Sequence, residues 1–118
     1  MKDFRKLNAW EKGHLLTLEV YKETRSFPKK ELYGLSQMRR ASVSISSNIA
    51  EGCGRGSDAE LSRFCQISMG SANELEYQIL LSRDLGYLEN LLFEKLTIMV
   101  TEVKRMLTSF IQKLKVSR

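Results

Sequence analysis

The segment from Gln37 to Ser57, QMRRASVSISSNIAEGCGRGS, constrains the fold more than any other part of the chain. On a helix of 3.6 residues per turn, one side of it is apolar and the opposite side carries mostly short polar residues. Exposed helix faces are more often rich in Lys and Glu, because long charged side chains keep rotamer freedom there. We therefore predict a helix whose polar side packs against a neighbouring helix. This predicted contact, called the polar seam below, consists of Arg40, Ser44, Asn48, Glu51 and, on the following helix, Glu74.

The polar seam allows two interpretations. In the structural one, Arg40 meets Glu51 or Glu74, the neighbouring Asn and Ser satisfy the remaining donors, and the network fixes the helix register. Small residues on both helices permit close backbone approach. In the functional one, a surface for a ligand or nucleic acid is lined by Arg39, Arg40, Asn48 and Glu51. We favour the structural interpretation. The small residues are Ala41, Ser42, Ser46 and Ala50 on one helix and Ser68, Gly70, Ser71 and Ala72 on the next.

Three glycines, Gly52, Gly54 and Gly56, follow the seam and are expected to end the helix, since glycine adopts the left-handed cap conformation at little steric cost. Their spacing does not match dinucleotide-binding or Walker-type phosphate loops, and a helix rather than a strand precedes them. We interpret the turn as a corner between helices. A single phosphate group held at the start of the next helix, beside Arg55, is the alternative.

Helical periodicity continues through the rest of the chain. Asn8 with Glu11, and Ser57 with Glu60, match the pattern of a helix-starting capping box. Four helices with short connections predict an all-α, antiparallel, up-down-up-down four-helix bundle that forms one domain over residues 1–118. No segment has the two-residue period of a strand. The predicted helices run from Asn8 to about Ser26, from about Glu31 to about Cys53, from the Ser57 cap to about Asp84–Gly86, and from about Glu89 onward.

The last helix carries two adjacent apolar rows, which cover more angle than one buried face of a bundle helix needs. The surplus most simply predicts a subunit interface, with Leu107 of the second row at the contact. A generously packed core within one subunit is the alternative. The first row is Leu96, Met99, Val103, Met106 and Phe110, and the second is Leu92, Val100, Leu107, Ile111 and Leu114.

The chain has a net charge of +5, concentrated toward its two ends. Residues 1–30 carry eight basic and four acidic side chains, and residues 88–118 carry six and three. The basic residues are not interleaved with aromatic residues that we expect to be exposed, so the pattern favours sequence-independent phosphate contacts over base stacking. A solvated surface that keeps the protein soluble is an equally simple explanation. The candidate nucleic-acid-binding residues are Lys2, Arg5, Lys6, Lys12, Lys104, Arg105, Lys113 and Lys115.

The sequence indicates no enzyme, because it holds no Ser/His/Asp arrangement and offers its two thiols a single histidine. Glu11 and His14 have the spacing of a di-iron ligand pair, but a site needs two such pairs, so we expect no metal and no cofactor. Cys53 and Cys65 are too few for a disulfide scaffold and are expected to be reduced. Without a signal-peptide core or an apolar run of membrane-spanning length, we expect a cytoplasmic protein that does not bind membranes.

The run from Arg39 to Gly52, RRASVSISSNIAEG, resembles the signature of small bacterial four-helix-bundle proteins. That family is named after open reading frames in intervening sequences of large-subunit ribosomal RNA genes. Ser46 stands where the family pattern has proline, which predicts a straighter helix here. The likeness covers nearly the whole chain. It continues through Gly70–Leu75, Trp10, His14 and Phe27-Pro28.

The resemblance implies a homopentameric barrel with a basic, nucleic-acid-binding surface. A distant relative of the family is the accessory protein of diversity-generating retroelements. Our leading hypothesis is therefore a non-enzymatic homo-oligomeric scaffold that contacts structured RNA or DNA through backbone phosphates. The alternative is an adaptor that docks a protein partner such as a reverse transcriptase. A small-ligand site in the polar seam is a third, weaker hypothesis.

Overall fold

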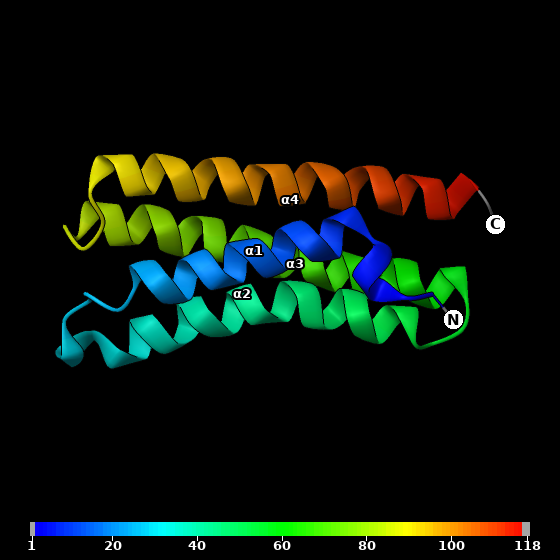
Figure 1. Ribbon diagram of the computed structural model, residues 1–118, viewed down its shortest axis with the longest axis horizontal. Helices are drawn as coiled ribbons and strands as arrows, with labels where there is room; N and C mark the ends of the chain where they lie inside the picture. The colour runs from blue at the N-terminus through cyan, green and yellow to red at the C-terminus, as the bar shows by residue number, and fades with distance from the viewer. Residues whose placement is uncertain (1, 117–118) are drawn as a thin grey trace.

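The computed structural model describes residues 2–116, except for the side chains of residues 31–33. Over these residues the predicted all-helical fold is confirmed: the chain forms four helices and no strand. Consecutive helices run in opposite directions, side by side, in a bundle 46 × 21 × 19 Å across (Figure 1). Two short 3-10 turns, η1 (Phe4–Lys6) and η2 (Lys29–Glu31), precede the first two helices. The helices are α1 (Asn8–Glu23), α2 (Leu32–Cys53), α3 (Asp58–Asp84) and α4 (Asn90–Val116).

The capping residues decide where the helices begin. Ser57 adopts an extended conformation and its side chain accepts a hydrogen bond from the Glu60 amide at 3.2 Å, as predicted for the start of α3. The predicted cap at Asn8 is wrong, because Leu7 holds the cap position and has no side-chain hydrogen bond. Turn η1 extends the chain at Leu7, so that Asn8 is already the first helical residue. Three glycines, Gly52, Gly54 and Gly56, are predicted to end α2 in the left-handed conformation. Of these, Gly56 alone has a positive φ.

Both apolar rows of α4 face the bundle, and each contains fully buried and partly buried residues. Leu96 and Val103 of the first row are fully buried, and so are Val100 and Leu107 of the second. The prediction that Leu107 lies at a subunit interface is therefore wrong. Helix α4 packs against both α1 and α3, so a single subunit already needs the wide apolar face.

Helix α1 is shorter than α4, one of the two helices that it packs against. It has 16 residues, about 24 Å at 1.5 Å per residue, whereas α4 has 27 residues and spans about 40 Å. The chain before α1 turns away toward the corner between α2 and α3, where the Lys2 amide donates a hydrogen bond to the Cys53 carbonyl oxygen at 3.2 Å. The C-terminal part of α4 consequently extends past the start of α1 (Figure 1).

Several large apolar side chains lie on the outer faces of the bundle. Leu15 and Leu18 of α1 are 41% and 54% exposed. No helix among the described residues is long and apolar enough to span a membrane. The other exposed large apolar residues of α3 and α4 are Ile67, Tyr77, Leu80, Leu81, Leu91, Ile98 and Val116.

Candidate nucleic-acid interface

The polar seam lies at the surface between α2 and α3. Arg40 contacts Glu74 and not Glu51: its Nη2 donates to Glu74 Oε2 at 2.7 Å, and its Nε donates to Gln37 Oε1 at 3.0 Å. The Arg40 side chain is 53% exposed and that of Glu74 is 41% exposed. The pair is thus solvent-screened, and the seam is less deeply packed than its short side chains suggest.

The uncharged seam residues satisfy one another. The hydroxyls of Ser44 and Ser71 are 2.8 Å apart across the two helices. Asn48 Nδ2 donates to the Ser44 carbonyl oxygen at 2.8 Å and to the Ser44 hydroxyl at 3.0 Å. Because these groups are occupied by one another, the geometry favours the structural interpretation of the seam over a ligand site.

Small residues mediate two helix contacts rather than the single one predicted. On the α3 side of α2, the Ser68 hydroxyl donates to the Ile45 carbonyl oxygen at 2.7 Å. On the α1 side, the Ser46 hydroxyl donates to the Trp10 carbonyl oxygen at 3.2 Å. Ser46, one of the small residues of α2, therefore hydrogen-bonds to α1 and not to α3, which a helical wheel without a known neighbour cannot reveal.

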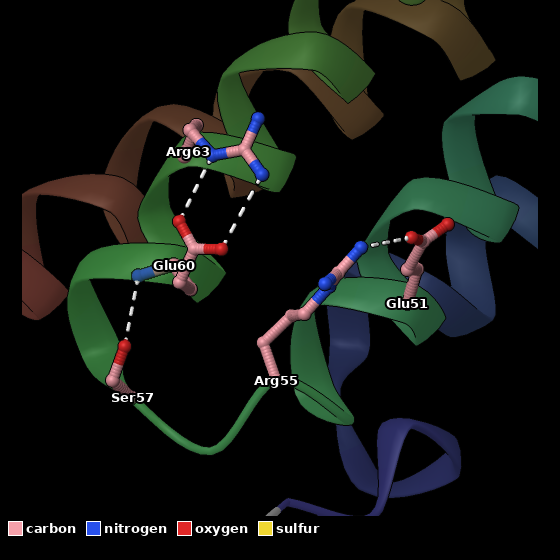
Figure 2. Close-up of polar contacts among 5 residues, drawn as sticks. All are labelled: Glu51, Arg55, Ser57, Glu60 and Arg63. Carbon is pink, nitrogen blue, oxygen red and sulfur yellow. Dashed lines mark hydrogen bonds and ion pairs between the residues drawn. The ribbon is translucent and has the colours of Figure 1, made fainter.

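The corner between α2 and α3 is occupied by internal ion pairs. Figure 2 shows Arg55 directed back at Glu51, with Nη2 and Oε2 2.7 Å apart, and Arg63 beside Glu60 at 2.9 Å. Glu51 is thereby held at the corner and does not join the polar seam. Since the Arg55 charge is already paired, the phosphate-binding alternative for this turn is weakened.

Ion pairs also occupy several of the candidate nucleic-acid-binding residues. Lys12 Nζ lies 3.4 Å from Glu102, and Lys104 Nζ lies 2.8 Å from Glu76. Arg5 pairs with Asp3 at 3.3 Å, and Lys2 lies at the α2–α3 corner. Lys115 is exposed near the end of α4. None of these five side chains lines the groove described next, although Lys12 pairs with its lining residue Glu102.

Three of the candidates do come together, in a groove of about 720 Å³ between the start of α1 and the C-terminal half of α4. Lys6 lies on the α1 side, and Arg105 and Lys113 lie on α4. Among the described residues, Lys6 and Arg105 form no ion pair, and the acidic residue of the lining, Glu102, pairs with Lys12. The groove is therefore positively charged. Its lining comprises Lys6, Leu7, Asn8, Ala9, Ile98, Glu102, Arg105, Met106, Ser109, Phe110 and Lys113.

The groove also contains two residues that we assigned from the sequence to the first apolar row of the last helix and not to the binding residues. Met106 and Phe110 pack against the core but are only partly buried, and they line the groove beside the cations. They remain partly exposed because α1 is too short to cover them, and the length of α1 cannot be read from the sequence pattern of α4. A stacked ring pair lies outside the lining of this groove: the His14 ring stacks on the Trp10 ring, with ring centroids 5.1 Å apart and planes 9° apart.

The two cysteine side chains lie in the core. Burial raises the pKa of Cys65 to about 12, and burial also raises the pKa of Cys53 despite the opposing charge of Lys2. Both cysteines are buried free thiols. Among residues 2–116, excluding the undescribed side chains, no group of His, Cys, Asp and Glu is placed to hold a metal ion.

Comparison with known proteins finds solved structures of similar fold and a matching family model. A crystal structure of a protein with unknown function from the S23 ribosomal protein family of Bacteroides thetaiotaomicron is similar in fold, with a TM-score of 0.81 and 23% sequence identity. The alignment covers 88% of this chain and 95% of that one. No curated protein matches the sequence. The family model described as 23S rRNA-intervening sequence protein matches residues 5–109, and the chain belongs to that family.

Proposed function

We propose that this protein is a non-enzymatic scaffold that binds structured RNA or DNA through backbone phosphates, using the groove between α1 and α4. The observation that supports the proposal is the convergence of Lys6, Arg105 and Lys113 on one groove. Phosphate contacts supply the sequence-independent part of nucleic-acid affinity, and they require accessible cations. Residues that already form internal ion pairs, such as Lys12 and Lys104, contribute less.

The spacing of these cations suits an extended polyanion. Arg105 and Lys113 are eight residues apart on α4, which separates their Cα atoms by about 12 Å along the helix axis. Lys6 approaches from the opposite side of the groove. A chain of phosphates that follows the groove meets positive charge on both sides.

We also propose that the scaffold is a cytoplasmic homo-oligomer. The family resemblance implies a pentamer, and the exposed Leu18, Tyr77 and Ile98 side chains provide apolar surface for association. Repetition around a ring would present one cationic groove per subunit. Several weak phosphate contacts would then act together on one nucleic acid, which raises the overall affinity.

The decisive measurement is the salt dependence of binding to a labelled RNA stem-loop, followed by fluorescence anisotropy. The affinity should fall steeply with salt and vary little with sequence, because each phosphate contact adds roughly 0.7 to 0.9 to the slope of log K against log salt. Replacing Lys6, Arg105 and Lys113 by Gln should weaken binding and flatten that slope.

The matched control replaces Lys22, Lys29 and Lys30, near the opposite end of the bundle, by Gln. It removes the same charge and should retain most of the affinity. Equal losses in the two triple variants would refute the groove as the site. Affinity that does not change between low and moderate salt would refute phosphate binding altogether, and would favour the protein-binding adaptor.

A further inference from the structure

Part of the groove lining, called the apolar floor below, is apolar and is not used by phosphate binding. Leu7, Met106 and Phe110 all line it and are only partly buried by the core. A groove that served phosphates alone would need donors and cations there instead. We therefore expect the apolar floor to contact a part of the ligand other than its phosphates.

The mixed composition of the lining narrows the class of ligand. Six of its eleven residues are polar or charged, and apolar residues make up the rest. A groove for an amphipathic peptide helix needs a continuous apolar row to receive anchors at helical spacing. A nucleic-acid duplex keeps its bases stacked inside and presents phosphates outward, so it leaves an apolar floor empty. An unpaired strand offers both a charged backbone and flat apolar faces.

We infer that the groove binds an unpaired, single-stranded segment of nucleic acid, with its phosphates beside Lys6, Arg105 and Lys113 and a base against Phe110. This inference rests on the proposed function and specifies its substrate. It replaces the expectation from sequence that base stacking plays no part, since Phe110 lies in the same groove as the three cations. In structured RNA such segments are loops, bulges and ends.

The shape of the groove follows from the fold. Its lining on α4 runs from Ile98 to Lys113, about 22 Å along the helix axis. On the other side it is bounded only by the residues from Lys6 to Ala9, because the chain before them turns toward the α2–α3 corner. A flexible strand can follow such a bounded groove, whereas a rigid duplex touches mainly its rim.

The test compares a labelled oligouridylate of about twelve nucleotides, within the range of known single-strand sites, with a fully paired duplex of the same length. The single strand should bind more tightly to the wild-type protein. Phe110→Leu keeps an apolar side chain but removes the ring, and should weaken oligouridylate binding about fivefold or more while leaving duplex binding unchanged. Phe93→Leu, on the same helix but outside the groove, is the matched control.

A second measurement does not depend on any variant. Oligouridylate carrying 4-thiouridine should photocrosslink to wild-type protein at Phe110 or Met106, and crosslinks confined to other faces would overturn the inference. If duplex and single strand bind equally and Phe110→Leu changes neither, the single-strand inference fails while phosphate binding stands. If neither probe binds, the proposed function fails as well. Displacement of bound oligouridylate by an acidic amphipathic peptide, together with crosslinks away from Phe110, would assign the groove to a protein partner instead.

Discussion

Gly52 provides a direct test of how closely α2 and α3 approach. It lies within the last turn of α2 and is buried. A Cβ added there would lie 2.9 Å from both Leu61 Cδ1 and Phe64 Cβ, and 3.3 Å from Leu61 Cα. Two of these atoms belong to or adjoin the α3 backbone, so a side-chain rotation cannot relieve the contact.

The expected cost of Gly52→Ala combines two opposing terms. Overpacking a well-packed contact costs about 1–3 kcal/mol. Replacing a helical glycine by alanine returns up to about 1 kcal/mol. We therefore expect Gly52→Ala to lower the free energy of unfolding by up to about 3 kcal/mol.

Gly70→Ala is the matched control, because Gly70 is also helical but exposed, and its added Cβ would meet nothing within 4 Å. This variant should be stabilised by up to about 1 kcal/mol through helix propensity alone. The difference between the two variants isolates the overpacking cost.

Thermal unfolding measures the difference. For 118 residues the unfolding entropy is about 0.25 kcal/mol/K, so each 1 kcal/mol shifts Tm by about 4 °C. Gly52→Ala should melt up to about 12 °C below the wild type, and Gly70→Ala up to about 4 °C above it. All samples need the same subunit concentration, since association shifts Tm. If Gly52→Ala is as stable as Gly70→Ala, the close approach of α2 and α3 is refuted.

Three further predictions concern the core, the seam and the thiols. Leu107→Ala should lower stability by about 2–5 kcal/mol in urea unfolding, because its side chain is fully buried; loss of association at unchanged stability would instead place it at an interface. Arg40→Ala should lower stability by only about 0.2–1 kcal/mol, because its ion pair with Glu74 is exposed. Light scattering should show an unchanged subunit number. A larger loss of stability or a change of mass would reveal an assembly role. The folded-state pKa of Cys65, about 12, lies above its ordinary value of 9.0. Stability should therefore fall as pH rises from about 9 to 12, by at most about 1.4 kcal/mol per pH unit. Cys65→Ala should show a shallower decline, and a pH profile identical to that of the wild type would refute the contribution of this thiol.

The sequence predicts the helices well because their signals are local. The bounds of α2 and α3 agree with prediction to within one residue, and the Ser57 cap forms as expected. The cap at Asn8 is predicted wrongly, because turn η1 places Leu7 at the cap position. Apolar periodicity reports the width of a buried face but not what covers it, so it cannot place Leu107 in the core rather than at an interface.

The candidate site is harder to predict, because it depends on which helices are neighbours. Lys12 and Lys104 look equivalent to Arg105 in sequence, yet acidic side chains on adjacent helices pair with them. Phe110 belongs to an apolar row and becomes part of a groove only because α1 begins too late to cover it. Relative helix length is a property of the whole bundle, and a scan for local motifs does not detect it.

The way α1 is attached also determines how the molecule opens. On its α4 side, α1 is held by two partly exposed ion pairs, Lys12 with Glu102 and Glu19 with Lys95 at 3.0 Å, whereas α2 and α3 share a tight corner and buried hydrogen bonds such as Ser68 to Ile45. Partial unfolding should therefore begin with release of α1, and native-state hydrogen exchange should show less protected amides in α1 than in α3. Such a release would widen the groove from one side, so local opening of the shortest helix would control access to the cationic surface.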